Sequence, residues 1–254
     1  MGWIVAIFVF YFGSIIGSFL NVCIDRIPRE ESIAFPPSHC GNCNTGLKPL
    51  DLIPIFSYIF LKGKCRYCGT LVSVQYLFLE LITGVAYLLL YFKFGLTLNL
   101  LKFTVFTSIL IVIAVIDYKT QDVYTSTIIV GVILGIIFIG IEYLYGINKE
   151  VFNSILAVVI PGGILYLIVW LTGAMGEGDA EIIFVSGLFL GLKLNLFNLF
   201  LSIVIGGIVA IGLMILKKKS GKEAIAFGPY IALSSYLVIF IGQPILNWYF
   251  SMLF

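Results

Sequence analysis

The sequence predicts an all-α polytopic membrane protein with about eight transmembrane helices and one small cysteine-containing loop. Of its 254 residues 61% are hydrophobic and only 11% are charged, and the mean hydropathy is +1.12. A soluble domain does not carry that much apolar surface. The apolar residues form continuous runs instead of the alternating pattern of a membrane β-barrel. The lipid bilayer is therefore an expected partner, and no nucleic-acid partner is expected.

The apolar runs define the predicted spans in order. The first run, Trp3–Val22, lacks the basic start and the Ala-x-Ala site of a signal peptide, so we expect it to be retained. Seven further runs lie at 74–92, 98–116, 123–144, 152–172, 180–192, 196–215 and 226–245. Each has about the length that crosses a bilayer, roughly 20 residues, except the short run 180–192. The break after it is weak, because only Lys193, Asn195 and their neighbours divide it from the next run.

Lysines and arginines indicate the orientation of these spans. They gather in the loop between the first two runs, at Lys119 and in the stretch Lys217–Lys222, whereas the opposite loops hold few. Because positive charges stay on the cytoplasmic side, we expect the N-terminus outside and these segments inside. The Lys217–Lys219 run is interpreted as a topology anchor rather than a binding site.

Four of the five cysteines fall in the loop between the first two runs. They form two C-x-x-C pairs, CGNC at Cys40 and Cys43 and CRYC at Cys65 and Cys68. This spacing is typical of a zinc ribbon, in which four thiolates enclose a structural Zn²⁺. The alternatives are two disulfides, which a reducing cytoplasm disfavours, or reduced thiols without a role. We interpret Cys23 as a packing residue and His39 as a bystander, since four cysteines already fill the metal's shell.

Two aspartates stand at the ends of runs that are distant in sequence. Asp117 closes the third run, and Asp179 precedes the sixth within the stretch AMGEGDAE, 174–181. In the expected topology both lie at the cytoplasmic end of the membrane. Two carboxylates at one depth can flank one water and share a proton, so that one acts as a base and the other as an acid. This is aspartic-protease chemistry without a serine, cysteine or metal nucleophile.

Simpler interpretations exist for the same residues. Asp179 alone could be a helix N-cap, and Gly176 and Gly178 could be loop residues, although glycines also let a peptide backbone approach closely. Asp122 lies five residues after Asp117 and would face another side of a helix, so we do not expect it in the pair. Intramembrane carboxylates also occur in transporters, which is the alternative of another class.

Four motifs in order resemble the type IV prepilin peptidases, a family of GxGD aspartic membrane peptidases. Gly176–Asp179 has the GxGD pattern and follows an earlier run that ends in an aspartate. Gly17–Arg29 is similar to the family's N-terminal signature, Ser38–Gly84 to its cysteine-rich region, and Ala226–Leu233 to its late FGP motif. The resemblance covers nearly the whole chain.

The resemblance implies a bifunctional enzyme of the bacterial cytoplasmic (inner) membrane with its active site facing the cytoplasm. Asp117 and Asp179 would be the catalytic pair that cuts the leader of prepilin or pseudopilin precursors. S-adenosylmethionine would then methylate the new N-terminus, and Cys40, Cys43, Cys65 and Cys68 would hold zinc. The implied domains are a first transmembrane helix at 1–24, a cytoplasmic methyltransferase-associated loop at 25–73 and a peptidase core at 74–254.

The sequence departs from the family's pattern at three places. Val123-Tyr124-Thr125 stands where a proline often follows the first aspartate, Glu181 where a lysine follows the second, and Ala226 where a proline precedes FGP. None of these removes a catalytic carboxylate. No glycine-rich motif for S-adenosylmethionine is found, so the residues that bind this cofactor stay unknown. A GxGD peptidase without methyltransferase activity is therefore the alternative within enzymes.

Overall fold

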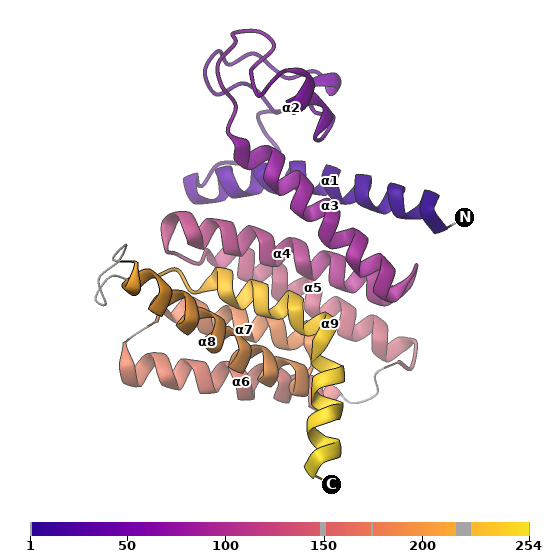
Figure 1. Ribbon diagram of the computed structural model, residues 1–254, viewed down its shortest axis with the longest axis vertical. Coiled ribbons are helices and arrows are strands. Elements are labelled where there is room, and N and C mark those ends of the chain that lie inside the picture. The colour runs from indigo at the N-terminus through magenta and orange to yellow at the C-terminus, as the bar shows by residue number, and fades with distance from the viewer. Residues whose placement is uncertain (1, 148–150, 174, 217–224, 254) are drawn as a thin grey trace. The chain divides into compact units, whose positions relative to one another are not determined.

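The computed structural model describes residues 2–147, 151–173, 175–216 and 225–253, and the regular elements within these ranges are all helices (Figure 1). They are α1 (Gly2–Arg26), η1 (Ile27–Arg29), η2 (Pro49–Asp51), α2 (Phe56–Phe60), α3 (Val74–Phe94), α4 (Leu98–Thr120), α5 (Thr125–Leu144), α6 (Val151–Thr172), α7 (Glu177–Leu190), α8 (Leu192–Ile215) and α9 (Gly228–Leu253). The prediction of an all-α fold is confirmed.

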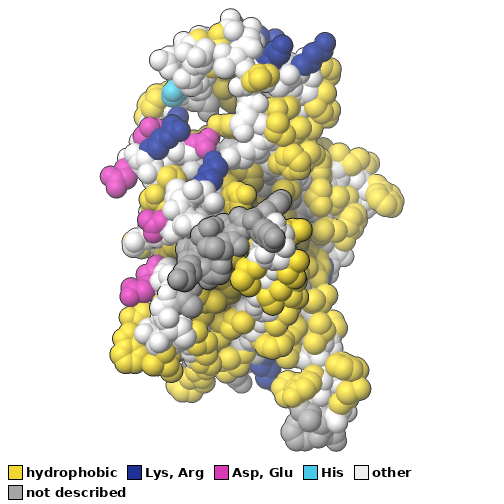
Figure 2. Space-filling view, turned by 60° about the vertical axis from the view of Figure 1, so that its left-hand side comes forward, with side chains coloured by type: hydrophobic (Ala, Val, Ile, Leu, Met, Phe, Trp, Pro, Cys, Tyr) yellow, Lys and Arg dark blue, Asp and Glu magenta, His cyan; other side chains and the backbone are white. Residues whose placement is uncertain are grey.

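Seven of the described helices are long and apolar enough to cross a membrane. They are α1, α3, α4, α5, α6, α8 and α9. The remaining predicted run, 180–192, forms α7, which has 14 residues and is too short to be counted with them. Hydrophobic side chains cover much of the right-hand side of the molecule in the view of Figure 2. The chain is therefore a multi-pass membrane protein.

The break between α7 and α8 differs from the predicted one. It lies at Gly191, whose φ of 78° is readily adopted only by glycine, and not at Lys193 and Asn195. Lys193 and Asn195 are inside α8. The polar residues suggested a loop, but Asn195 is fully buried and its amide has partners in the protein. The lysine run Lys217–Lys219 and Lys222 lie outside the described residues.

The chain divides into two compact units, Met1–Val112 and Ile113–Phe254. In the first unit, α1 and α3 pack closely along glycines. A side-chain carbon added at Gly17 would lie only 2.7 Å from the carbonyl oxygen of Leu79, so no larger residue fits without movement. Small residues at such contacts are the usual way for membrane helices to approach each other. The cysteine loop joins these two helices.

In the second unit, the short helix α7 is held among α5, α6, α8 and α9. Pro161 inside α6 has no N–H, so the carbonyl of Ala157 lacks its usual helical donor. The Asn195 amide donates to that carbonyl at 2.9 Å and to the Ile183 carbonyl of α7 at 3.0 Å. One α8 side chain thus binds α6 and α7 together, which fixes the helix that carries Asp179.

Candidate active site and metal centre

Asp117 is buried in the last turn of α4. Its side chain is 4% exposed, and its Oδ2 accepts a hydrogen bond from the backbone N–H of Gly228 at 2.7 Å. Gly228 is the first residue of α9, where backbone N–H groups have no partner within the helix. α4 continues to Thr120, so Asp117 lies inside the helix rather than closing it as the sequence suggested.

Asp179 is buried in the first turn of α7 and is held in a similar way. It is 6% exposed, and its Oδ2 accepts a hydrogen bond from the N–H of Gly176 at 3.1 Å. The N-cap residue is Gly176, since α7 begins at Glu177. The interpretation of Asp179 as the N-cap is therefore wrong in position. Asp179 is the third residue of the helix. Its carboxylate accepts the backbone N–H of the N-cap residue, as the acidic member of a capping box does.

The fold brings the two aspartates into one site within the second unit. Their carboxylates are near enough to interact electrostatically. Each accepts one N–H from a glycine at the N-terminal end of a helix, where the helix dipole favours negative charge. In both cases the N–H reaches Oδ2 of the carboxylate. Such a pair is suited to sharing one proton and to activating one water.

The two glycines near Asp179 differ in how closely other residues surround them. Gly178 faces the side chain of Val123, because an added Cβ would lie 2.6 Å from the Cβ of Val123. Gly176 has open space, with only the Asp179 carboxylate 3.8 Å from an added Cβ. Glu177 is exposed and Glu181 is half-buried. Both glycines were predicted to admit a substrate backbone; an added Cβ has room at Gly176 but not at Gly178.

Asp122 lies in the exposed turn that follows α4. It interacts electrostatically with Asp117, although it is not buried with the pair. The turn forms because Gln121 takes a left-handed conformation, with φ of 56°. Asp122 is therefore an exposed carboxylate that is near Asp117 in sequence and in electrostatic contact with it, but it is not part of the buried site.

The sequence does not reveal the contacts of two residues of this site, Gly228 with Asp117 and Val123 with Gly178. Gly228 belongs to the late motif Ala226–Leu233, and Val123 stands where a proline often follows the first aspartate. Neither sequence pattern indicates which residue Gly228 or Val123 contacts. Gly228 is tightly enclosed, because an added Cβ would lie 2.6 Å from Asp117 Oδ2. A glycine there is required for the N–H to reach the carboxylate.

The four predicted cysteines form a cluster in the first unit. Four sulfur atoms all lie within 4.8 Å of one another, those of Cys40, Cys43, Cys65 and Cys68. The sulfurs of Cys40 and Cys68 are 3.8 Å apart, and all four thiols are free. Zn–S bonds of about 2.3 Å in tetrahedral geometry would separate the sulfurs by about 3.8 Å. The cluster could therefore bind a metal of this kind, and the disulfide alternative is not adopted.

The two cysteine pairs have the same backbone geometry. The N–H of Cys40 donates to the carbonyl of Thr45, and the N–H of Asn44 donates to the carbonyl of Cys40. In the second pair, the N–H of Cys65 donates to the carbonyl of Thr70, and the N–H of Gly69 donates to the carbonyl of Cys65. Isolated bridges close both turns, between His39 and Gly46 and between Lys64 and Leu71. Each pair is thus a knuckle that points two thiols inward.

Polar contacts around the cluster support it. Hydrogen bonds from the Thr70 hydroxyl and backbone lower the pKa of the Cys68 thiol to about 6, which favours the thiolate that binds metal. Arg66 and Tyr67, between the cysteines of the second pair, bind the carboxylate of Asp51. Burial raises the pKa of Asp51, but these hydrogen bonds outweigh it and hold the pKa below its usual range.

The remaining cysteine and the histidine lie outside the cluster. His39 is exposed, and its Nδ1 is 3.0 Å from the carbonyl oxygen of Pro37. Cys23 is buried in α1. Neither belongs to the group of possible metal ligands, in agreement with the expectation from sequence.

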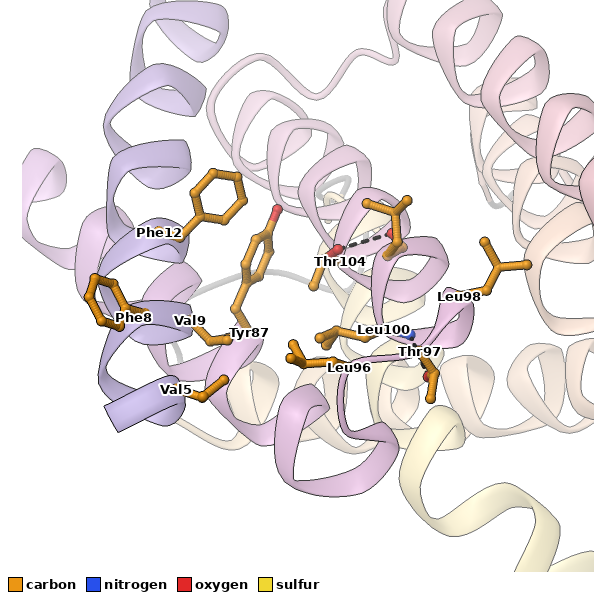
Figure 3. Close-up of a pocket in the computed structure, with 11 residues that line it drawn as sticks. Val5, Phe8, Val9, Phe12, Tyr87, Leu96, Thr97, Leu98, Leu100 and Thr104 are labelled. Carbon is orange, nitrogen blue, oxygen red and sulfur yellow. Dashed lines mark hydrogen bonds between the residues drawn. The ribbon is translucent and has the colours of Figure 1, made fainter. Parts of the chain in front are cut away.

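A cavity of about 540 Å³ lies in the first unit, between α1, the end of α3 and the start of α4 (Figure 3). Its lining is almost entirely apolar, with Phe8, Phe12 and Leu100 among the side chains. The Thr104 hydroxyl bonds to the Leu101 carbonyl of its own helix. No predicted site residue lines this cavity, and it presents no chemistry of its own.

Comparison with family models places two matches along the chain. Residues 11–94 match the model described as "Bacterial Peptidase A24 N-terminal domain". Residues 104–211 match the model described as "Type IV leader peptidase family". The first match includes all four clustered cysteines, and the second includes both buried aspartates.

Similar proteins align over most of their length. A prepilin leader peptidase/N-methyltransferase of Bacillus subtilis (strain 168) is 31% identical over 96% of this chain and 97% of its own. A protein of the same name from Neisseria gonorrhoeae is 30% identical over 94% of this chain and 92% of its own. No solved structure matches this chain.

Proposed function

The chain belongs to the type IV prepilin leader peptidase/N-methyltransferase family, and on that premise we propose that it cleaves the leader from prepilins or pilin-like precursors. Asp117 and Asp179 are the proposed catalytic pair. The observation that carries this proposal is the burial of both carboxylates in one site, each bound by a glycine N–H. Buried carboxylates at helix ends in a membrane protein are costly without a role.

In the proposed mechanism the two aspartates share one proton. The ionised carboxylate takes a proton from water, whose oxygen attacks the carbonyl carbon of the scissile peptide bond. The protonated carboxyl donates its proton to the carbonyl oxygen. As the C–N bond breaks, the departing amine takes the proton that the other carboxylate removed from water, and a hydroxyl of the intermediate returns a proton to the first carboxylate. The N–H groups of Gly228 and Gly176 orient the carboxylates, and the open space at Gly176 admits the substrate backbone.

The proposed second activity is N-methylation of the newly formed N-terminus with S-adenosylmethionine. It is supported by the names of the relatives, which include N-methyltransferase. We propose that the loop 25–73 serves this activity and that the core 74–254 serves cleavage. Zn²⁺ held by Cys40, Cys43, Cys65 and Cys68 would fold the loop, because few of the loop's apolar side chains are buried. The residues that hold S-adenosylmethionine are not assigned.

The proposed location is the bacterial inner membrane with the site facing the cytoplasm. The lysine and arginine distribution supports this orientation. A pilin precursor has a basic leader and an apolar helix, so its helix would lie in the bilayer and its leader would emerge at the depth of Asp117 and Asp179.

The proposal is tested by reconstituting the purified chain in lipid vesicles with a model prepilin and S-adenosylmethionine. Intact-mass spectrometry should show loss of the leader and then the added mass of one methyl group. Cleavage without methylation would favour the peptidase-only alternative. If no model prepilin is cleaved while vesicles carrying the chain conduct protons or cations, the transporter alternative is favoured instead.

We expect Gly228→Ala to reduce leader cleavage strongly without unfolding the protein. The added methyl group would lie 2.6 Å from Asp117 Oδ2, so the carboxylate must move away from its N–H donor. A displacement of this kind commonly costs about 10²-fold in rate. Initial cleavage rates measured by mass spectrometry give the comparison.

Gly207→Ala in α8 is the matched control, because an added Cβ there meets nothing within 4 Å. It should cleave at the parental rate. Equal rates for the two variants would contradict the role of Gly228 in positioning Asp117.

A further inference from the structure

The apolar segment Leu52–Leu61, with the sequence LIPIFSYIFL, stands out within the cysteine loop. It contains no charged residue, whereas Asp51 precedes it and Lys62 follows it. It includes the single-turn helix α2. Ten residues are too few to span a bilayer and are of the length found in re-entrant or interfacial segments.

Contacts with both neighbouring membrane helices place this segment beside them rather than beyond their ends. The ring of Phe56 lies 6.4 Å from the ring of Tyr11 in α1. Tyr11 is fifteen residues before the end of α1 at Arg26, a distance of ~22 Å along the helix axis. Figure 1 shows α2 alongside α1 in the same unit. The segment therefore reaches the depth of the α1 span.

A buried carboxylate of α3 holds the start of α2. The backbone N–H of Ile55 donates to Glu80 Oε2 at 2.7 Å, and Glu80 is six residues, ~9 Å, along α3 from Val74. Glu80 is buried and also has a side-chain hydrogen bond with Ser18 of α1. A carboxylate at this depth requires polar partners, and the irregular backbone of the segment supplies one.

Further hydrogen bonds satisfy the segment's backbone internally. The N–H groups of Ser57, Ile59 and Leu61 bond to carbonyls four residues earlier. After the helix, Lys62 and Gly63 bond back to Ile59 and Tyr58. Non-helical backbone is tolerated at membrane depth only when its polar groups are paired in this way.

The side chains that point outward are apolar. Phe56, Ile59 and Phe60 are exposed, and Phe60 is 81% exposed. The two neighbouring spans also carry exposed apolar side chains, among them Phe19 in α1 and Phe78 in α3. Lys62 and Lys64, just past the segment, are exposed and could extend their ammonium groups to the lipid headgroups.

We propose that Leu52–Leu61 is a re-entrant segment that inserts into the hydrocarbon of the bilayer, in the leaflet that contains the C-terminal end of α1. The exposed face contacts lipid acyl chains, because its side chains are apolar and the segment lies against two membrane spans. Glu80 fixes the segment's depth through the N–H of Ile55. The cysteine knuckles are then tethered to the membrane on one side by this segment.

The test places single tryptophans in the full-length chain and measures quenching by lipids. Trp3, Trp170 and Trp248 are replaced by phenylalanine, and Phe60→Trp is reconstituted in vesicles of phosphatidylcholine with brominated acyl chains. Phe78→Trp, at an exposed residue of α3 outside the cavity of Figure 3, is the lipid-exposed reference. Leu71→Trp, at a residue of the same loop that is 76% exposed, is the control outside the segment.

The proposal requires the Phe60→Trp emission to be blue-shifted, to lose most of its intensity in brominated vesicles as Phe78→Trp does, and to resist aqueous acrylamide. Leu71→Trp should be quenched by acrylamide and much less by bromine. If Phe60→Trp instead behaves like Leu71→Trp, the segment is not selectively inserted and the proposal fails. A water-exposed Phe60→Trp in these vesicles would point to a protein partner absent from them.

Discussion

Asp117→Asn and Asp179→Asn should each lower leader cleavage by at least about 10²-fold, the usual contribution of a general acid or base. Asparagine keeps an oxygen that can accept the N–H of Gly228 or Gly176, so the fold should persist. It cannot exchange a proton with water, so the shared-proton mechanism is lost. Intact-mass spectrometry of a model prepilin gives the rates.

Asp122→Asn is the matched control for this pair. It removes the same charge from the same region, but from an exposed turn. We expect it to cleave at nearly the parental rate, although its electrostatic effect on Asp117 is removed. If Asp117→Asn or Asp179→Asn cleaves as fast as Asp122→Asn, the aspartate mechanism is wrong and Asp179 serves only to cap α7.

Cys65→Ser should remove bound zinc and abolish N-methylation while leader cleavage continues. A structural Zn²⁺ supplies about 10–16 kcal/mol of folding free energy, which a loop with little apolar core cannot replace. The cluster belongs to the unit Met1–Val112, whereas both aspartates belong to the unit Ile113–Phe254. Zinc per chain is measured by plasma mass spectrometry, and methylation by the mass of the cleaved product.

Cys23→Ala is the control, since Cys23 is a buried cysteine of α1 outside the cluster. It should retain zinc, cleavage and methylation. Methylated product from a zinc-free Cys65→Ser variant would contradict the role of the loop. Loss of cleavage together with methylation would contradict the division of the two activities between loop and core.

Much of the fold follows from local composition. Each long apolar run became a helix, because a run of that length in lipid must satisfy its backbone within itself. Both C-x-x-C pairs became knuckles, because the turn geometry of such a pair depends on a few adjacent residues. The order of the four motifs was also sufficient to identify the family.

Boundaries that depend on a partner were predicted less well. Lys193 and Asn195 suggested a loop, whereas the chain breaks at Gly191 and Asn195 bonds to α6 and α7. Asp179 suggested an N-cap, whereas Gly176 takes that position. In each case a polar side chain was assigned a local role, and the fold gave it another position or partner.

By itself, the sequence determined the membrane class, the four-cysteine loop and the two aspartates at the ends of distant runs. Only the tertiary structure decided that Gly228 donates to Asp117, that Gly178 accommodates Val123 and that Glu80 holds Ile55. Helix and knuckle formation depend on neighbours in sequence, so composition and spacing reveal them. A hydrogen bond between residues 111 positions apart, as from Gly228 to Asp117, depends on how whole helices pack, and no local pattern encodes it.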